Sequence, residues 1–161
     1  MTTTKTTMDR TTEAIAAALL SVARAMNQVR THEMLCKRAG VDLDRSGGAL
    51  LYKLYAEGED VRLTELAERL AVDPPAVTRK VQQLERAGLL ARSADPADAR
   101  AMRLRLTPEG RHSIERLLSA RQQWLDSLLR GWSGDDRREF ARLLQLLAST
   151  IEFEAEVSHG G

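Results

Sequence analysis

Between positions 75 and 86 the chain carries polar side chains of the types that hydrogen-bond to the edges of nucleobases. An arginine can pair with guanine through two hydrogen bonds, a glutamine can pair in the same way with adenine, and a threonine offers a hydroxyl and a methyl group. The candidate contacts are Pro75, Ala76, Thr78, Arg79, Gln82, Gln83 and Arg86. Helical spacing gathers most of them on one face, which predicts a surface for double-stranded DNA. The alternative is the solvated face of an ordinary helix.

The same segment has the signals of a helix whose opposite face is buried. Asp73 is a good N-cap, Pro74 suits the first helical position because it lacks an N–H, and Gly88 stands where helices commonly end. The apolar residues of the opposite face are Val77, Val81 and Leu84. They predict a helix packed against a core, with its polar face turned outward.

A shorter helical pattern precedes this helix. Thr64 can cap it, and its inward residues are Leu66, Ala67 and Leu70. Only Ala71, Val72 and Asp73 then separate the two patterns, so the second helix is fixed against the first at a tight corner. This order predicts a helix-turn-helix.

After Gly88 the apolar spacing changes from helical to alternating, which predicts a β-hairpin. One strand begins at Leu89–Leu90. The second strand has three apolar residues on the packed face and two arginines on the charged face, in the order Met102, Arg103, Leu104, Arg105 and Leu106.

The residues between these strands, 94–101, favour bends and form the tip of the predicted hairpin. Arg100 is a candidate for insertion into the minor groove, with Asp98 holding the turn. The alternative is a surface ion pair between Asp98 and Arg100, which contributes little to stability. Arg103 and Asp98 complete the set of candidate DNA-binding residues.

Together these segments resemble the MarR-type winged-helix transcriptional regulators. The motifs that carry the resemblance are Leu63-Thr64 with Leu66-Ala67, Ala76-Val77-Thr78-Arg79, Leu84-Glu85 with Gly88-Leu89, Asp95-Pro96-Ala97-Asp98-Ala99-Arg100, and Leu106-Thr107-Pro108-Glu109-Gly110. They occur in the family's order and spacing. The sequence departs from the family at Asp73-Pro74-Pro75, where members often carry serine or another small polar residue.

The resemblance implies a homodimeric, ligand-responsive regulator, with repression as the expected direction, that binds a pseudo-palindromic operator. It also implies a cleft between the dimerisation helices and the DNA-binding region that holds a small phenolic or aromatic acid. His32 and Tyr52 are the expected lining residues of that effector site. For Tyr52 the alternative is helix packing with a solvated hydroxyl.

Helical patterns flank the DNA-binding region on both sides. One runs from about Asp9 to Ala39 and ends at Gly40, a shorter one covers Ser46–Ala56, and another runs from Pro108 to about Arg130. After a break at Gly131–Gly134, Ser133 and Asp136 form an acidic variant of a capping box for a last helix.

We therefore expect a mainly α fold, a winged helix-turn-helix with a small β-hairpin wing between long dimerisation helices. The expected parts are a loose N-terminal tail at 1–8, a dimerisation helix with its linker at 9–45, the winged helix-turn-helix at 46–107, the C-terminal dimerisation helices at 108–157 and a loose tail at 158–161.

The flanking helices carry more apolar surface than a small DNA-binding region can cover. The residues concerned are Ile15, Leu19, Leu125, Leu128, Trp132, Leu144, Leu147 and Ile151, and Phe140 and Leu143 share the inward face of the last helix. This excess predicts a homodimer interface. An internal three-helix bundle, which would use the same residues, is the alternative.

Composition narrows the classes of protein that the chain can belong to. The net charge is only +1, but residues 62–111 hold 10 Lys+Arg against 7 Asp+Glu, while residues 112–161 hold 6 against 8. The positive charge is therefore local to the predicted DNA-binding region. No apolar run is long enough to span a bilayer, which favours a cytoplasmic protein without a membrane partner.

Catalytic and cofactor sites are not indicated. Three scattered histidines, a single cysteine and the lack of a glycine-rich phosphate loop give no enzyme constellation and no cofactor site. A winged helix that binds proteins instead of DNA stays open as an alternative function.

His32, Glu33 and Cys36 form an H-E-x-x-C pattern near the end of the first helix. His32 and Cys36 are four residues apart, so they can share one face and hold a transition metal, but two or three ligands make a weak metal site. A peroxide-sensing thiol is a second possibility for Cys36. The favoured interpretation is a structural cysteine, and no metal site is expected.

Overall fold

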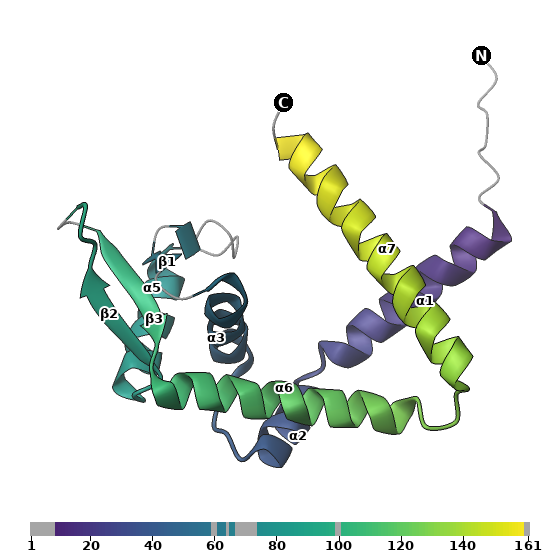
Figure 1. Ribbon diagram of the computed structural model, residues 1–161, viewed down its shortest axis with the longest axis horizontal. Coiled ribbons are helices and arrows are strands. Elements are labelled where there is room, and N and C mark those ends of the chain that lie inside the picture. The colour runs from purple at the N-terminus through teal and green to yellow at the C-terminus, as the bar shows by residue number, and fades with distance from the viewer. Residues whose placement is uncertain (1–8, 59–60, 64, 67–73, 99–100, 160–161) are drawn as a thin grey trace. The chain divides into compact units, whose positions relative to one another are not determined.

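The computed structural model describes residues 9–58, 61–63, 65–66, 74–98 and 101–159, which are mostly helical (Figure 1). The helices are α1 (Arg10–Met26), α2 (Val29–Ala39), α3 (Arg45–Glu57), α5 (Pro74–Arg86), α6 (Pro108–Leu128) and α7 (Gly134–His159). The strands are β1 (Val61–Arg62), β2 (Leu90–Ala94) and β3 (Met102–Leu106). These helices and strands confirm the predicted mainly α fold with a small β-hairpin wing.

Several predictions fall on residues outside this described part of the chain. These residues are the tails 1–8 and 160–161, the turn residues Glu59 and Asp60, the helix positions Thr64, Ala67 and Leu70, the link Ala71–Asp73, and Ala99 and Arg100 at the tip of the wing. The chain divides into two compact units at Arg121–Gln122, and each is described by itself.

The N-terminal helix is two helices, so the prediction of a single helix over 9–39 is wrong. Gln28 adopts an extended backbone with ψ 138°, which ends the helical hydrogen bonding of α1 and starts α2 at Val29. The Thr31 hydroxyl donates a hydrogen bond of 2.9 Å to the carbonyl of Ala25 and so satisfies an acceptor at the broken end. The apolar repeat continues across the break, and it therefore conceals it.

The core of the first unit forms around α3. Leu50, Leu51 and Leu54 of this helix are buried. Other elements bring further buried residues, which are Leu66, Val77, Val81 and Leu84, Leu104 and Leu106 of β3, and Ile114 and Leu117 of α6. The buried residues of α3 and the predicted apolar face of α5 thus share one core, and burial of their side chains holds α5 in place.

Helix α5, which carries the predicted DNA-contacting face, is closed at Gly88, as the sequence predicted. Gly88 has φ 72°, a left-handed conformation that glycine adopts without a steric penalty. The N–H of Gly88 donates to the carbonyl of Glu85 and the N–H of Leu89 donates to that of Leu84, both at 2.9 Å. This is a Schellman closure, and it turns the chain directly from the helix into β2.

The strands form one antiparallel sheet in the order β1-β3-β2. Leu90 pairs with Leu106 in the hairpin, and Val61 of β1 pairs with Leu104 on the other edge of β3. The third strand β1 was not predicted, since two residues are too short for an alternating pattern. Met102 was predicted to pack but is exposed, because its partner Ala94 is the last residue of the ladder at the wing end.

The second unit holds the end of α6 and helix α7. The Ser133 hydroxyl accepts a hydrogen bond of 3.1 Å from the N–H of Asp136 and donates one of 2.6 Å to its carboxylate. This confirms Ser133 as the helix cap and Asp136 as its partner. α6 ends at Leu128, two residues before the predicted end.

The apolar residues of this unit are largely uncovered in the single chain. Trp132 and Phe140 contact each other edge to face, with ring centroids 5.3 Å apart. Both remain exposed, as do Leu143, Leu144 and Ile151, while Leu147 is half-buried. The single chain therefore leaves most of these residues exposed, and the homodimer interface stays a prediction.

Candidate nucleic-acid interface

Helix α5 has the two faces that its spacing predicts. Val77, Val81 and Leu84 are at most 4 % exposed. On the other side the exposed residues are Pro75, Arg79, Gln82, Gln83 and Arg86, and Ala76 and Thr78 at the margins are half-buried. The buried face fixes how the helix lies, and so it fixes which side chains reach outward. All seven candidate contacts of this helix are thus accessible to solvent in whole or in part.

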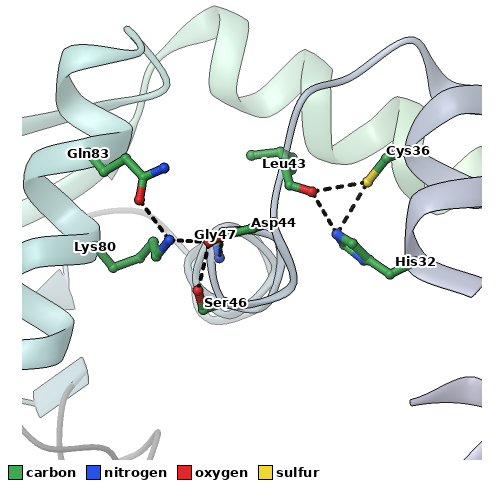
Figure 2. A network of polar contacts seen from close by, with 8 residues as sticks. All are labelled: His32, Cys36, Leu43, Asp44, Ser46, Gly47, Lys80 and Gln83. Atoms are coloured by element: carbon green, nitrogen blue, oxygen red, sulfur yellow. Dashed lines mark hydrogen bonds and ion pairs between the residues drawn. The ribbon is translucent and has the colours of Figure 1, made fainter. Parts of the chain in front are cut away.

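Lys80 was not among the predicted site residues, although it ties α5 to the start of α3. Its ammonium group forms an ion pair with Asp44 and donates a hydrogen bond of 2.7 Å to the side-chain oxygen of Gln83 (Figure 2). Asp44 also caps α3 by accepting the N–H of Gly47 at 2.8 Å. Burial opposes ionisation of Asp44, but the hydrogen bonds from Lys80 and Gly47 outweigh it and lower the pKa of Asp44.

The base of the wing is held by Asp95, whose side chain is fully buried. Its carboxylate accepts hydrogen bonds from the N–H of Ala97 at 2.8 Å, from Arg62 of β1 at 2.7 Å and from Arg103 of β3 at 2.9 Å. The bond from Ala97 first, and then that from Arg62, hold the pKa of Asp95 well below its usual range. One carboxylate therefore joins the edge strand β1 and the central strand β3 to the turn.

The sequence pointed to Asp98 as the residue that holds this turn, and Asp95 was missed. Asp98 is exposed, and its backbone carbonyl accepts the N–H of Ala101 at 2.9 Å. An available signal was the Asp95-Pro96-Ala97 segment, since aspartate often accepts the backbone N–H two residues further on. The partner Arg62 has no such local signal. Arg103, a candidate DNA contact, lies on β3 of the wing, and its guanidinium is bound to Asp95.

A pocket of about 220 Å³ in the first unit is lined by both His32 and Tyr52. Its wall includes two arginines, Arg45 and Arg121. Arg45 donates a hydrogen bond of 2.9 Å to the side chain of Asn27, whereas the buried Nε of Arg121 has no partner among the described residues. The pocket thus joins apolar helix surface to cationic groups, which sequence reasoning did not place there.

Cys36 is buried and its thiol donates a hydrogen bond of 3.3 Å to the carbonyl of Leu43. Burial raises the pKa of Cys36, so the reactive thiolate is disfavoured. His32 Nε2 lies 2.7 Å from the same carbonyl, and it must carry the proton because a carbonyl oxygen only accepts. This arrangement favours the structural interpretation of Cys36. No cluster of three or more potential metal ligands occurs in the described ranges.

Two further findings concern membrane spans and the match to a known family. None of the helices in the described part is long and apolar enough to cross a membrane. Residues 44–102 match the model of the MarR family.

Curated relatives agree with this match. The HTH-type transcriptional regulator YxaD of Bacillus subtilis is 32% identical over 109 residues, which are 68% of this chain and 75% of YxaD. The regulator YdgJ of the same organism is 30% identical over 102 residues, 63% of this chain. The aligned part spans 62% of YdgJ, which is less than two thirds of its length.

Solved structures share the fold. A MarR family protein from Bacillus stearothermophilus superimposes with a TM-score of 0.80 at 24% identity, over 90% of this chain and 98% of that one. A mutant of MepR from S. aureus, bound to an oligodeoxyribonucleotide, has a TM-score of 0.60 at 20% identity, over 85% of this chain and 97% of its own. The chain therefore belongs to the MarR family of winged-helix transcriptional regulators.

Proposed function

We propose that the protein is a homodimeric transcriptional repressor that binds a pseudo-palindromic operator and is released from it by a small phenolic or aromatic acid. The observation that carries DNA binding is the outward polar and cationic face of α5, held by three buried side chains. The oligodeoxyribonucleotide bound to the structurally similar MepR supports the same use of the fold.

Contacts to DNA divide between bases and phosphates. Arg79 and Gln82 lie on the exposed face of α5 and are the main candidates for base edges, with Thr78 and Gln83 beside them. Arg86 at the end of the helix suits a phosphate. Arg100, which lies between the two wing strands in the sequence, is the proposed minor-groove residue, and the Asp95 network supports those strands.

Dimerisation is proposed from the uncovered apolar residues. Ile15 and Leu19 of α1 are exposed in the single chain, as are Leu144 and Ile151 of α7. A two-fold dimer covers such surface and separates two α5 helices by about one turn of DNA, roughly 34 Å. Sedimentation should give a dimer at micromolar concentration, and Leu144→Glu should shift it toward monomer. A monomeric wild-type protein contradicts the dimer.

The effector site is proposed from the pocket that His32 and Tyr52 line. A carboxylate suits it because the guanidinium groups of Arg45 and Arg121, which line the pocket, can form charge-assisted hydrogen bonds. Apolar residues such as Leu117 suit an aromatic ring. Such a ligand must bind the DNA-free conformation more tightly in order to release the operator.

Arg79→Ala tests the proposed DNA contact. It should weaken operator binding by about 1–3 kcal/mol and relax sequence choice at one position of the site. Arg138→Ala is the matched control, because it removes the same charge from an exposed position on α7. Equal operator affinity of the Arg79 variant and the control contradicts the assignment of Arg79. An intact fold without any salt-dependent DNA binding favours a protein-interaction module instead.

A further inference from the structure

The last two residues of the link between α2 and α3, Leu43-Asp44, form a step that contacts both α2, on the side of the pocket, and α5. The Leu43 carbonyl accepts the Nε2–H of His32 at 2.7 Å and the thiol of Cys36 at 3.3 Å, both from α2. The next side chain, Asp44, pairs with Lys80 of α5. Figure 2 shows these contacts on opposite sides of the step. Consecutive residues therefore hold two different helices.

The first turn of α3 fills the space beside this step. A Cβ atom on Gly47 would lie 2.8 Å from the Asp44 carboxylate and 3.3 Å from the Leu84 side chain of α5. A Cβ atom on Gly48 would lie 3.3 Å from the His32 ring. This turn thus packs against His32 on one side and against Leu84 of α5 on the other. Close packing of this kind transmits small displacements.

His32 is the point at which the pocket and this network meet. It lines the pocket together with Arg45 and Gly48, which directly follow the step or belong to the same turn. A ligand that binds the His32 ring, or displaces it, competes with the hydrogen bond to Leu43. Movement of Leu43 carries Asp44 with it, since the two residues share a peptide bond.

We propose that Leu43-Asp44 couples the pocket to the DNA-reading helix: the His32 bond to Leu43 keeps Asp44 where it holds Lys80, and loss of that bond loosens α5. The inference rests on the proposed function, of which it specifies the regulation. Asp44 and Lys80 act as positioning residues, because they fix where α5 places the side chains that contact the bases. Linkage requires that DNA, in turn, disfavours the ligand-bound state of His32 by the same factor.

The test is a mutant cycle read by amide hydrogen exchange in the DNA-free full chain. His32→Ala should speed exchange of the amides at 77–86 by at least about threefold, within the range that residues along coupling networks produce. The same substitution should have little effect on these amides in an Asp44→Asn or Lys80→Met background. Asparagine keeps a helix cap at position 44, so this variant removes the ion pair selectively.

Glu85→Gln is the matched control, because Glu85 of α5 pairs with Arg92 of β2 at 2.9 Å on the wing side. In that background the effect of His32→Ala should persist in full. Gly48→Ala, which presses on the His32 ring without removing it, replaces His32→Ala if the latter fails to fold by circular dichroism. If the effects of His32→Ala and Lys80→Met on exchange simply add, the coupling is overturned.

Operator affinity of the same variants separates this inference from the proposed function. Non-additivity should appear there too, by at least about threefold. If the wild-type protein binds no operator specifically, the proposed function fails, while the exchange cycle still decides whether His32 and α5 are coupled. Normal operator binding with additive effects in both measurements overturns the coupling alone.

Discussion

Replacing Gly110 by alanine should strongly destabilise the winged-helix unit. Gly110 lies in the first turn of α6 and is buried against the backbone where α5 passes into β2. A Cβ atom there would lie 1.9 Å from the carbonyl oxygen of Leu89, whereas real Cβ contacts essentially never fall below 3.0 Å. The first turn of α6 must therefore retreat from Leu89 by more than an ångström, and backbone rather than a movable side chain is in the way.

That retreat also breaks a hydrogen bond. The N–H of Thr107 donates to the same Leu89 carbonyl at 3.1 Å. Overpacking costs about 1–3 kcal/mol, and leaving a buried hydrogen-bonding group unpaired costs about 1–3 kcal/mol. We therefore expect a loss of about 2–6 kcal/mol in the free energy of unfolding. For a chain of this size the midpoint of thermal unfolding should fall by about 5–15 °C.

Thermal and urea unfolding of the two proteins measure this difference. Gly131→Ala is the control, because a Cβ atom at Gly131 meets nothing within 4 Å. The control should stay within about 1 kcal/mol of the wild type. If Gly110→Ala unfolds at the same temperature as Gly131→Ala, the close approach of α6 to Leu89 is refuted.

Three further predictions concern the wing, the thiol and the pocket. Asp95→Asn should lower the free energy of unfolding at neutral pH. Because the folded pKa of Asp95 is lowered, its stabilising contribution is present above the unfolded value of about 3.9 and is lost as pH falls further. The free energies of unfolding of the two proteins should therefore converge in acid, and curves that stay parallel contradict this. Cys36 should react slowly with a thiol reagent in the native protein and rapidly in urea, because its pKa is raised by burial; equal rates contradict a structural thiol. Arg121→Gln should weaken binding of 2-hydroxybenzoate about tenfold or more in calorimetry while operator affinity is kept, and unchanged binding removes Arg121 from the site.

Local sequence patterns predicted the elements that local forces form. The buried and exposed faces of α5 follow from helical spacing, and its end at Gly88 follows from the need for a left-handed residue. The alternating strand β3 was predicted for the same kind of reason. The wing hairpin therefore needed no information beyond its own segment.

Contacts between distant segments were not predictable in this way. Lys80 pairs with Asp44 across 36 positions, and Arg62 pairs with Asp95 across 33. Spacing within a helix or strand carries no signal of such partners. Asp95 was therefore overlooked, and Asp98, two residues before the candidate Arg100, was taken as the residue that holds the turn. The break at Gln28 was hidden because the apolar repeat continues on both sides of it.

The proposed repressor is tested most directly by binding of the full chain to the DNA upstream of its own gene, against a scrambled duplex and across a salt series. Fluorescence anisotropy should show binding to the native duplex that is tighter by about 10³-fold or more. The logarithm of affinity should fall linearly with the logarithm of salt concentration, since α5 and the wing replace counterions at phosphates. Equal, weak binding to both duplexes contradicts specific recognition of this operator.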